Sequence, residues 1–171
     1  MLTVTLSDGV NPPVAVPLAA PRVVAWTGTV GDYVVNALQV NSNAPATKTA
    51  VLPVTLDVKR VGTASGPLSV TATDDGLSGP VASLLNLVTS IAASKFDAKA
   101  GTLLRGQASL GDTTTGVVQI MASGVQPQGY RKGTPGDQAP RGATFFLQQV
   151  LWLDLKDGEA FDGSATATAA G

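Results

Sequence analysis

Apolar and small polar side chains alternate with a period of two along much of this chain. Leu2–Leu6 reads Leu-Thr-Val-Thr-Leu, Leu68–Thr73 reads Leu-Ser-Val-Thr-Ala-Thr, and Phe161–Ala169 repeats the pattern with small residues. Successive side chains of a β-strand point to opposite faces, so this pattern predicts strands with one buried face. Glycine, proline and aspartate, which favour turns, separate these segments. The chain is therefore predicted to be all-β, an antiparallel β-sandwich (jelly-roll or Ig-like) of about nine strands.

Residues 22–61 are predicted to form three strands, with a tight turn between the first two. Arg22–Val30 and Tyr33–Val40 are rich in β-branched and aromatic residues, and the Gly31-Asp32 pair between them predicts a tight turn. Val51–Val61 reads as one long strand. Pro53 near its start indicates an edge position or a bulge, because proline has no N–H to donate to a sheet.

Residues 80–99 fit two kinds of secondary structure. Their leucine, valine and isoleucine residues can be placed on one face of a helix, and the same letters also read as a strand over residues 87–93. Thr89, Ser90 and Ser94 are poor helix formers, which favours the strand. At most one short helix is therefore expected, near residues 81–93.

A chain of 171 residues fits a single sandwich domain over residues 1–171. Aromatic residues make up only 5%, so valine, leucine and alanine must form most of the core. Residues 1–20, which contain three prolines, are expected to form an N-terminal arm or a strand. Residues 123–142 are rich in glycine and proline and are expected to form a long surface loop.

The chain contains no histidine and no cysteine, and only 13% of its residues are charged. Histidine is the usual proton shuttle and the commonest metal ligand, and the cysteine thiolate is the usual thiol nucleophile. Triads built on histidine, ordinary zinc sites and thiol redox chemistry are thereby excluded. We expect no enzymatic activity, no catalytic residue, no cofactor and no metal site.

The formal net charge is −1, and the densest basic group is Arg131, Lys132 and Arg141. Nucleic acids and anionic membranes attract proteins through basic patches, so neither is an expected partner. No stretch of about 20 apolar residues is present that would cross a bilayer, so membrane insertion is not expected. A net charge near zero gives weak repulsion between copies, which favours a homo-oligomer or polymer.

Two groups of acidic residues have both a binding and a structural interpretation. Asp74-Asp75-Gly76 follows a strand and offers carboxylate oxygens for calcium, but the same residues favour a turn, which is the preferred interpretation. The second group is interpreted as a solvated strand end and hairpin near the C-terminus. It consists of Asp154, Asp157, Glu159 and Asp162.

Three aromatic residues are candidates for contacts with a ligand or partner. Trp26 and Trp152 lie inside strongly apolar strands, so burial in the core is the better interpretation of both. Tyr130 lies in the expected loop beside Arg131 and Lys132. It is either a contact residue for a partner or, more simply, an exposed loop tyrosine.

An ordered series of short motifs runs through residues 2–80. It consists of Leu6-Ser7-Asp8-Gly9, the Val23–Asn36 run with Trp-Thr-Gly-Thr-Val-Gly at its centre, Leu56-Asp57, Gly66-Pro67-Leu68-Ser69-Val70 and Thr73-Asp74-Asp75. The series resembles small exported bacterial proteins that carry the PEP-CTERM sorting tail. This resemblance implies an extracellular or surface-matrix β-sandwich and transfers no catalytic residue. The tail itself, Pro-Glu-Pro followed by a membrane helix and a basic end, does not occur in the sequence, and processing would remove it.

The first functional hypothesis is a non-enzymatic structural subunit of an extracellular or cell-surface assembly, such as a filament, surface layer or biofilm matrix. Its copies would associate through β-strand edges and arms, with Leu2–Leu6 or Ser123–Gly142 reaching a neighbour. One alternative is a bacteriophage virion protein, such as a capsid decoration or tail protein. Another is a carbohydrate- or calcium-dependent adhesion module. The expected location is extracellular or the cell surface, with the virion as the alternative.

Overall fold

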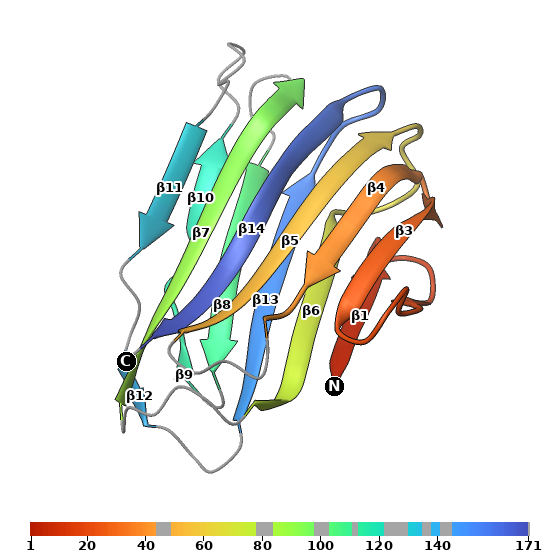
Figure 1. Cartoon of the computed structure of the whole chain (residues 1–171). Helices are drawn as coiled ribbons and strands as arrows, with labels where there is room; N and C mark the ends of the chain where they lie inside the picture. The colour runs from red at the N-terminus through yellow and green to blue at the C-terminus, as the bar shows by residue number, and fades with distance from the viewer. Residues whose placement is uncertain are drawn as a thin grey trace.

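All regular structure in the described part of the chain is β-strand. The computed structural model describes residues 1–43, 49–77, 84–97, 103–110, 113–121, 130–134, 138–140 and 145–170. Within these ranges fourteen strands form two sheets, every strand pair is antiparallel, and no residue is helical (Figure 1). The predicted all-β class is confirmed.

Each sheet contains seven strands. Sheet A has the order β10-β8-β13-β6-β1-β2, with β9 beside β8; its strands are β1 (Leu2–Ser7), β2 (Val14–Val16), β6 (Leu68–Leu77), β8 (Leu103–Leu110), β9 (Thr113–Thr114), β10 (Val118–Met121) and β13 (Phe145–Asp154). Sheet B has the order β11-β7-β14-β5-β4-β3, with β12 beside β7; its strands are β3 (Val23–Val30), β4 (Tyr33–Asn41), β5 (Thr49–Arg60), β7 (Leu84–Asp97), β11 (Tyr130–Thr134), β12 (Gln138–Pro140) and β14 (Ala160–Ala170).

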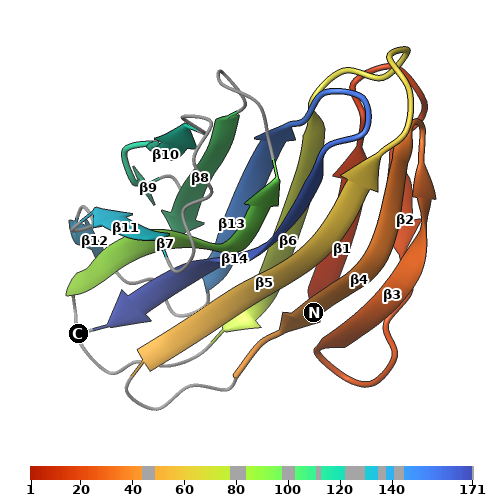
Figure 2. The same cartoon turned by 90° about the horizontal axis from the view of Figure 1, so that it is seen from above.

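The two sheets lie face to face as two layers (Figure 2). Their buried side chains form one hydrophobic cluster, made mainly of valine, leucine and alanine, with Tyr33 and Phe161 as its largest members. Gly106 of β8 allows a close approach between the layers, because a Cβ there would collide with Ile91 of β7. This arrangement is the predicted sandwich, held by aliphatic packing between facing sheets.

A buried polar pair also joins the two layers. Thr89 of β7 donates a hydrogen bond from Oγ1 to Gln149 Oε1 of β13 at 3.1 Å, and both side chains are fully buried. The Gln149 amide nitrogen donates to the Val150 carbonyl at 2.9 Å. Each described polar atom of this pair therefore has a partner in the core, as buried polar groups require.

The N-terminal residues belong to the body of the sandwich. Residues 1–20 were expected to form an arm or a strand, and they contain β1 and β2. β1 lies between β6 and β2, and its Leu2, Val4 and Leu6 side chains are buried in the core. Leu2–Leu6 is therefore not an arm that reaches a neighbour, because its apolar face is already covered by sheet B.

The structure decides between the two interpretations of residues 80–99 and adds strands to the expected loop at residues 123–142. Residues 84–97 form β7, which confirms the strand interpretation of this segment as far as it is described. Within residues 123–142, expected to be a loop, residues 130–134 and 138–140 form strands that pair with β7; the other residues of that segment lie outside the described ranges. The strand count exceeds nine mainly because short strands form in segments rich in glycine and proline.

The expectation for Pro53 is wrong. β5 is an inner strand between β14 and β4, and Pro53 pairs in regular register with Thr166 of β14. The ladder between β4 and β5 ends at the Val40–Val54 pair, and Val54 is the residue immediately after Pro53, so Pro53 has no ladder partner on β4. The missing N–H therefore falls where no β4 partner would use it, and an inner strand tolerates the residue.

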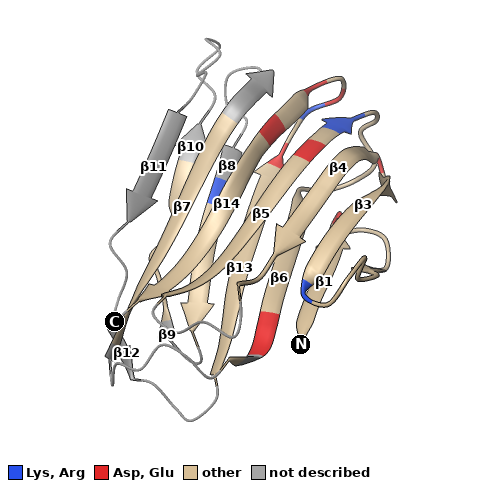
Figure 3. Ribbon diagram, viewed as in Figure 1, with Lys and Arg blue, Asp and Glu red and all other residues tan. Residues whose placement is uncertain are grey.

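Charged residues occupy few positions along the strands. Figure 3 shows most of the two sheets in the colour of uncharged residues. β3 and β4 contain no Asp, Glu, Lys or Arg. Backbone ladders and aliphatic packing, rather than ion pairs, therefore hold this part of sheet B.

We predict that the Thr89–Gln149 pair contributes to stability only as a complete pair. Thr89→Val leaves the Gln149 carbonyl oxygen buried without its donor, so the free energy of unfolding should fall by about 1–2 kcal/mol. The double variant Thr89→Val/Gln149→Leu removes both polar groups and should recover most of that loss. Urea unfolding of the three proteins measures the effect, and a double variant no more stable than Thr89→Val contradicts it.

Candidate functional site

A buried carboxylate lies at one end of the sandwich, immediately after β1. Asp8 is fully buried and accepts a hydrogen bond from Ser65 Oγ at 2.6 Å. It also accepts hydrogen bonds from the backbone N and the Nδ2 of Asn11, at 2.8 and 2.7 Å, and from the backbone N of Val10, at 3.1 Å. The Ser65 hydroxyl in particular, together with these amide donors, holds the pKa of Asp8 well below its usual range.

Ser65 connects this carboxylate to the β3–β4 hairpin. The backbone N of Asp32 donates to Ser65 Oγ at 2.8 Å, and the backbone N of Ser65 donates to Asp32 Oδ2 at 2.7 Å. The preceding residue, Gly31, has a φ of 54°, which suits glycine in a two-residue hairpin turn. A Cβ on Gly31 would also collide with the Asp8 carboxylate and the Ser65 hydroxyl, so the predicted tight turn is confirmed and its glycine is required.

Arg60 links the loops beside Asp8, at the same end of the sandwich, through hydrogen bonds from its guanidinium. Its guanidinium lies 5.3 Å from the centre of the Tyr33 ring and donates to the backbone carbonyls of Gly62, Leu155 and Ser65. The Tyr33 hydroxyl donates to the Gly66 carbonyl at 2.8 Å. The donors and acceptors of this network are used within the protein. We interpret the network as structural, because the Asp8 carboxylate accepts its hydrogen bonds from Val10, Asn11 and Ser65 of the same end.

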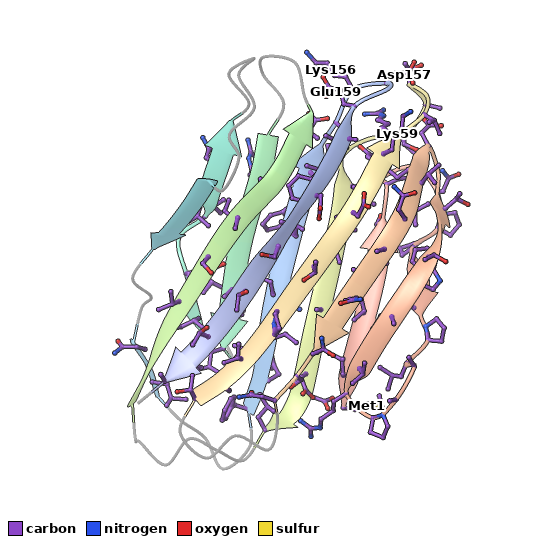
Figure 4. All side chains as sticks on the ribbon, turned by 45° about the horizontal axis from the view of Figure 1, so that its top comes forward. Met1, Lys59, Lys156, Asp157 and Glu159 are labelled. Atoms are coloured by element: carbon purple, nitrogen blue, oxygen red, sulfur yellow. The ribbon has the colours of Figure 1, made fainter. Side chains whose placement is uncertain are left out.

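The acidic pair Asp74 and Asp75 lies at the opposite end, near Met1. Figure 4 shows Met1 at one end of the sandwich and Lys59, Lys156, Asp157 and Glu159 at the other. Asp74 is fully buried, and its Oδ2 accepts from Arg22 Nη1 at 2.8 Å. The Met1 ammonium group lies 3.3 Å from Asp74 Oδ1 and bonds to the Asp75 carboxylate.

These contacts change the interpretation of Asp74-Asp75-Gly76. The three residues continue β6 to Leu77, so the expected turn is wrong. Two cationic groups already neutralise the carboxylates that were considered for calcium. Within the described ranges no group of three or more Asp, Glu, His or Cys is placed to hold a metal ion.

The C-terminal acidic residues do not form a hairpin. β13 and β14 belong to opposite sheets, so their connection crosses the end of the sandwich. Asp157 Oδ1 accepts from the Gly62 backbone N at 2.7 Å, and Glu159, which is buried, accepts from the Lys156 backbone N at 2.7 Å. Asp154 remains exposed at the end of β13. The expected solvated hairpin is therefore wrong, and at least two of these carboxylates fix the connection instead.

The outer face of sheet A carries a depression of about 270 Å³ beside Asp154. It is lined by Pro67, Arg105, Val117, Trp152 and Asp154. Trp152 is only partly buried and lies between the buried Leu151 and Leu153, so it points to the outer face. The expectation of a core position is therefore wrong for Trp152. Trp26, in contrast, packs against the core.

The alternation of side chains along β13 predicts part of this depression from the sequence. In β13 the buried side chains are Leu147, Gln149, Leu151 and Leu153, all at odd positions. Trp152 and Asp154 share the even parity of the outward-facing residues, so alternation alone places an indole beside a carboxylate on the outer face. Arg105 is brought to them by strand pairing, which the sequence does not reveal.

The remaining aromatic candidate lies in a strand. Tyr130, Arg131 and Lys132 begin β11 and pair with Ala93, Ala92 and Ile91 of β7. A second depression, of about 250 Å³, lies where β3 meets β4 and is lined by uncharged residues that include Trp26.

Comparison of the chain with known protein families, characterised proteins and solved structures found no match. Among the described residues there is no helix of the length and apolar character needed to cross a membrane.

We predict that the Asp8 carboxylate stabilises the fold at neutral pH and loses this effect in acid. Its pKa is lower in the folded protein than the ordinary value of 3.8, so the unfolded chain binds a proton first as the pH falls. The free energy of unfolding should therefore be highest above that value and should decrease progressively below about pH 4. Asp8→Asn should lower it by about 2–3 kcal/mol at pH 7 and should flatten the acid decrease.

Chemical unfolding at a series of pH values between neutral and acid measures this effect. Asp57→Asn is a matched control, because Asp57 lies on β5 away from the network and its described partner is Asn36. This control should keep the acid decrease of the wild-type protein. An Asp8→Asn protein with an unchanged pH profile contradicts the assignment.

Proposed function

We propose that the protein is a non-enzymatic structural subunit that associates with further copies through the free edge of β3. In this proposal it belongs to an extracellular or cell-surface assembly, the class that the motif series in residues 2–80 resembles. The observation that supports the proposal most directly is the composition and backbone geometry of β3.

β3 is the last strand of sheet B, with β4 as its ladder partner on one side. Val23 directs its N–H and C=O to the other side, where it exchanges hydrogen bonds with Ala20 at 3.0 and 3.3 Å. Backbone groups alternate in direction along a strand, so Ala25, Thr27 and Thr29 direct theirs to the same free side. In the part of the chain that is described, no strand pairs with these three residues.

Proteins commonly protect such edges with charges, prolines or short strands. β2, the end strand of sheet A, is only three residues long and is followed by Pro17. β3 spans eight residues and contains neither a charge nor a proline. It is therefore the better template for addition of a strand from another molecule.

A second copy fits this edge with two-fold symmetry. Two antiparallel β3 strands centred on Thr27 would place Ala25 opposite Thr29 of the other copy, and the two Thr27 side chains opposite each other. Such a contact is self-complementary, as a two-fold interface requires, and joins two B sheets into one. A polymer would need a second contact, and in strand order β10 and β11 end the two described sheets on the other side.

We predict that a lysine at the centre of β3 weakens association. Thr27→Lys places two like charges opposite each other across the two-fold contact, so the association constant should fall at least about tenfold. Thr55→Lys is the matched control, because Thr55 is also exposed but lies on the inner strand β5. Both variants change the net charge equally.

Sedimentation velocity at rising protein concentration measures this prediction. The wild-type protein and Thr55→Lys should increase in mass with concentration, and Thr27→Lys should lag behind both. A wild-type protein that stays monomeric throughout contradicts the proposal, and so does an equal effect of the two lysine variants.

A further inference from the structure

We propose that the depression around Trp152 on the outer face of sheet A is a binding site for an uncharged pyranose ring of a saccharide. The site and the free edge of β3 lie on different sheets. The depression is on β8 and β13 of sheet A, whereas β3 is the end strand of sheet B. The site therefore does not depend on self-association.

Strand register places a cation beside the indole. Trp152 of β13 pairs directly with Arg105 of β8 on one side and with Ser69 of β6 on the other. Directly opposed side chains on one face of an antiparallel sheet have Cβ atoms about 5 Å apart. The exposed guanidinium of Arg105 and the hydroxyl of Ser69 thus flank the indole of Trp152.

A carboxylate completes the site along the strand. Asp154 lies two residues after Trp152 and therefore on the same face. It is 54% exposed, and its described ionic contact is a 4.0 Å approach to Arg60 Nη1 from the end of the sandwich. Among the described residues Arg105 and Asp154 form no ion pair with each other, so both groups remain able to bind a ligand in the depression.

These groups match the chemistry of a sugar ring. One face of a pyranose presents C–H groups, which pack against a flat aromatic surface such as the Trp152 indole. Neighbouring hydroxyls on the ring edge can accept from the guanidinium fork of Arg105 and donate to the carboxylate of Asp154. Pro67 and the half-exposed Val117 supply further apolar surface.

Charge and size narrow the ligand class. One positive and one negative group line the same depression, so an acidic or a basic ligand would meet a like charge as well as an opposite one. An uncharged polyhydroxyl ring satisfies both groups at once. The volume of about 270 Å³ is slightly below the usual range for ligand sites, about 300–1,000 Å³, which suits a single ring rather than a buried chain.

Tryptophan fluorescence tests the proposal, because the chain contains only two tryptophans. In Trp26→Phe the emission reports Trp152 alone, and in Trp152→Phe it reports Trp26 alone. The probes are the methyl pyranosides of glucose, galactose and mannose and free N-acetylglucosamine, with glucuronic acid and glucosamine as charged counterparts. We expect a saturable change for at least one uncharged probe in Trp26→Phe, with a dissociation constant of about millimolar size.

Variants of the two charged groups test the assignment of residues. Arg105→Gln and Asp154→Asn, in the Trp26→Phe background, should each weaken binding about tenfold. Lys59→Gln is the matched control, because Lys59 is exposed on β5 of the other sheet, and it should leave binding unchanged. Far-ultraviolet circular dichroism should be the same for all variants, since Arg105 and Asp154 are exposed.

Three results overturn the proposal. One is the lack of a saturable change in Trp26→Phe with every uncharged probe. Another is an equal change in Trp152→Phe, which places binding elsewhere. The third is tighter binding of glucuronic acid or glucosamine than of the uncharged probes. Repeating the titration in the double variant Trp26→Phe/Thr27→Lys separates this site from self-association, since binding should persist there.

Discussion

The backbone ladders of β13 and β14 are the interaction on which the rest of the sandwich depends. β13 pairs with β6 on one side and β8 on the other, and β14 pairs with β5 and β7. Without these two strands, sheet A would separate into β1, β2 and β6 and a second group around β8, and sheet B would separate between β5 and β7. Ala160 pairs with Lys59, far away in sequence, so the loop-closure entropy of these ladders must be offset by their hydrogen bonds and burial.

The fold class follows from the sequence because alternation is a local property. Leu68–Thr73 and Phe161–Ala169 alternate, and both lie in strands whose buried faces match that alternation. Local propensity fits both a helix and a strand near residues 84–97, and pairing with β14 and β11 decides for the strand. β2, β11 and β12 could not be predicted, because short strands in segments with glycine and proline exist through their tertiary neighbours rather than through their own preference.

The polar groups show the same division between local and non-local information. Trp152 and Asp154 share a parity that is visible in the sequence, yet the apolar run around them suggested a core residue. Arg105 joins them only through the register of β8 on β13, and register depends on which strands pair. The network of Asp8 and Ser65 likewise connects loops that are far apart in the chain, so a sequence search finds an ordinary Ser-Asp-Gly turn there.

The two proposed surfaces are compatible in one molecule, and their combination has a physical consequence. Association at β3 extends sheet B sideways, whereas the Trp152 depression opens on the outer face of sheet A and is lined by β8, β13 and two loop residues. A two-fold contact at β3 would therefore leave both depressions of the pair open. A shallow site that holds a single ring binds weakly, because a small ligand contributes little contact area against the entropy lost on binding. Two or more such sites on one rigid assembly raise the effective concentration of the second site for a polysaccharide, so weak binding by each copy becomes strong attachment of the assembly. An associating subunit is thus the setting in which a weak saccharide site becomes useful.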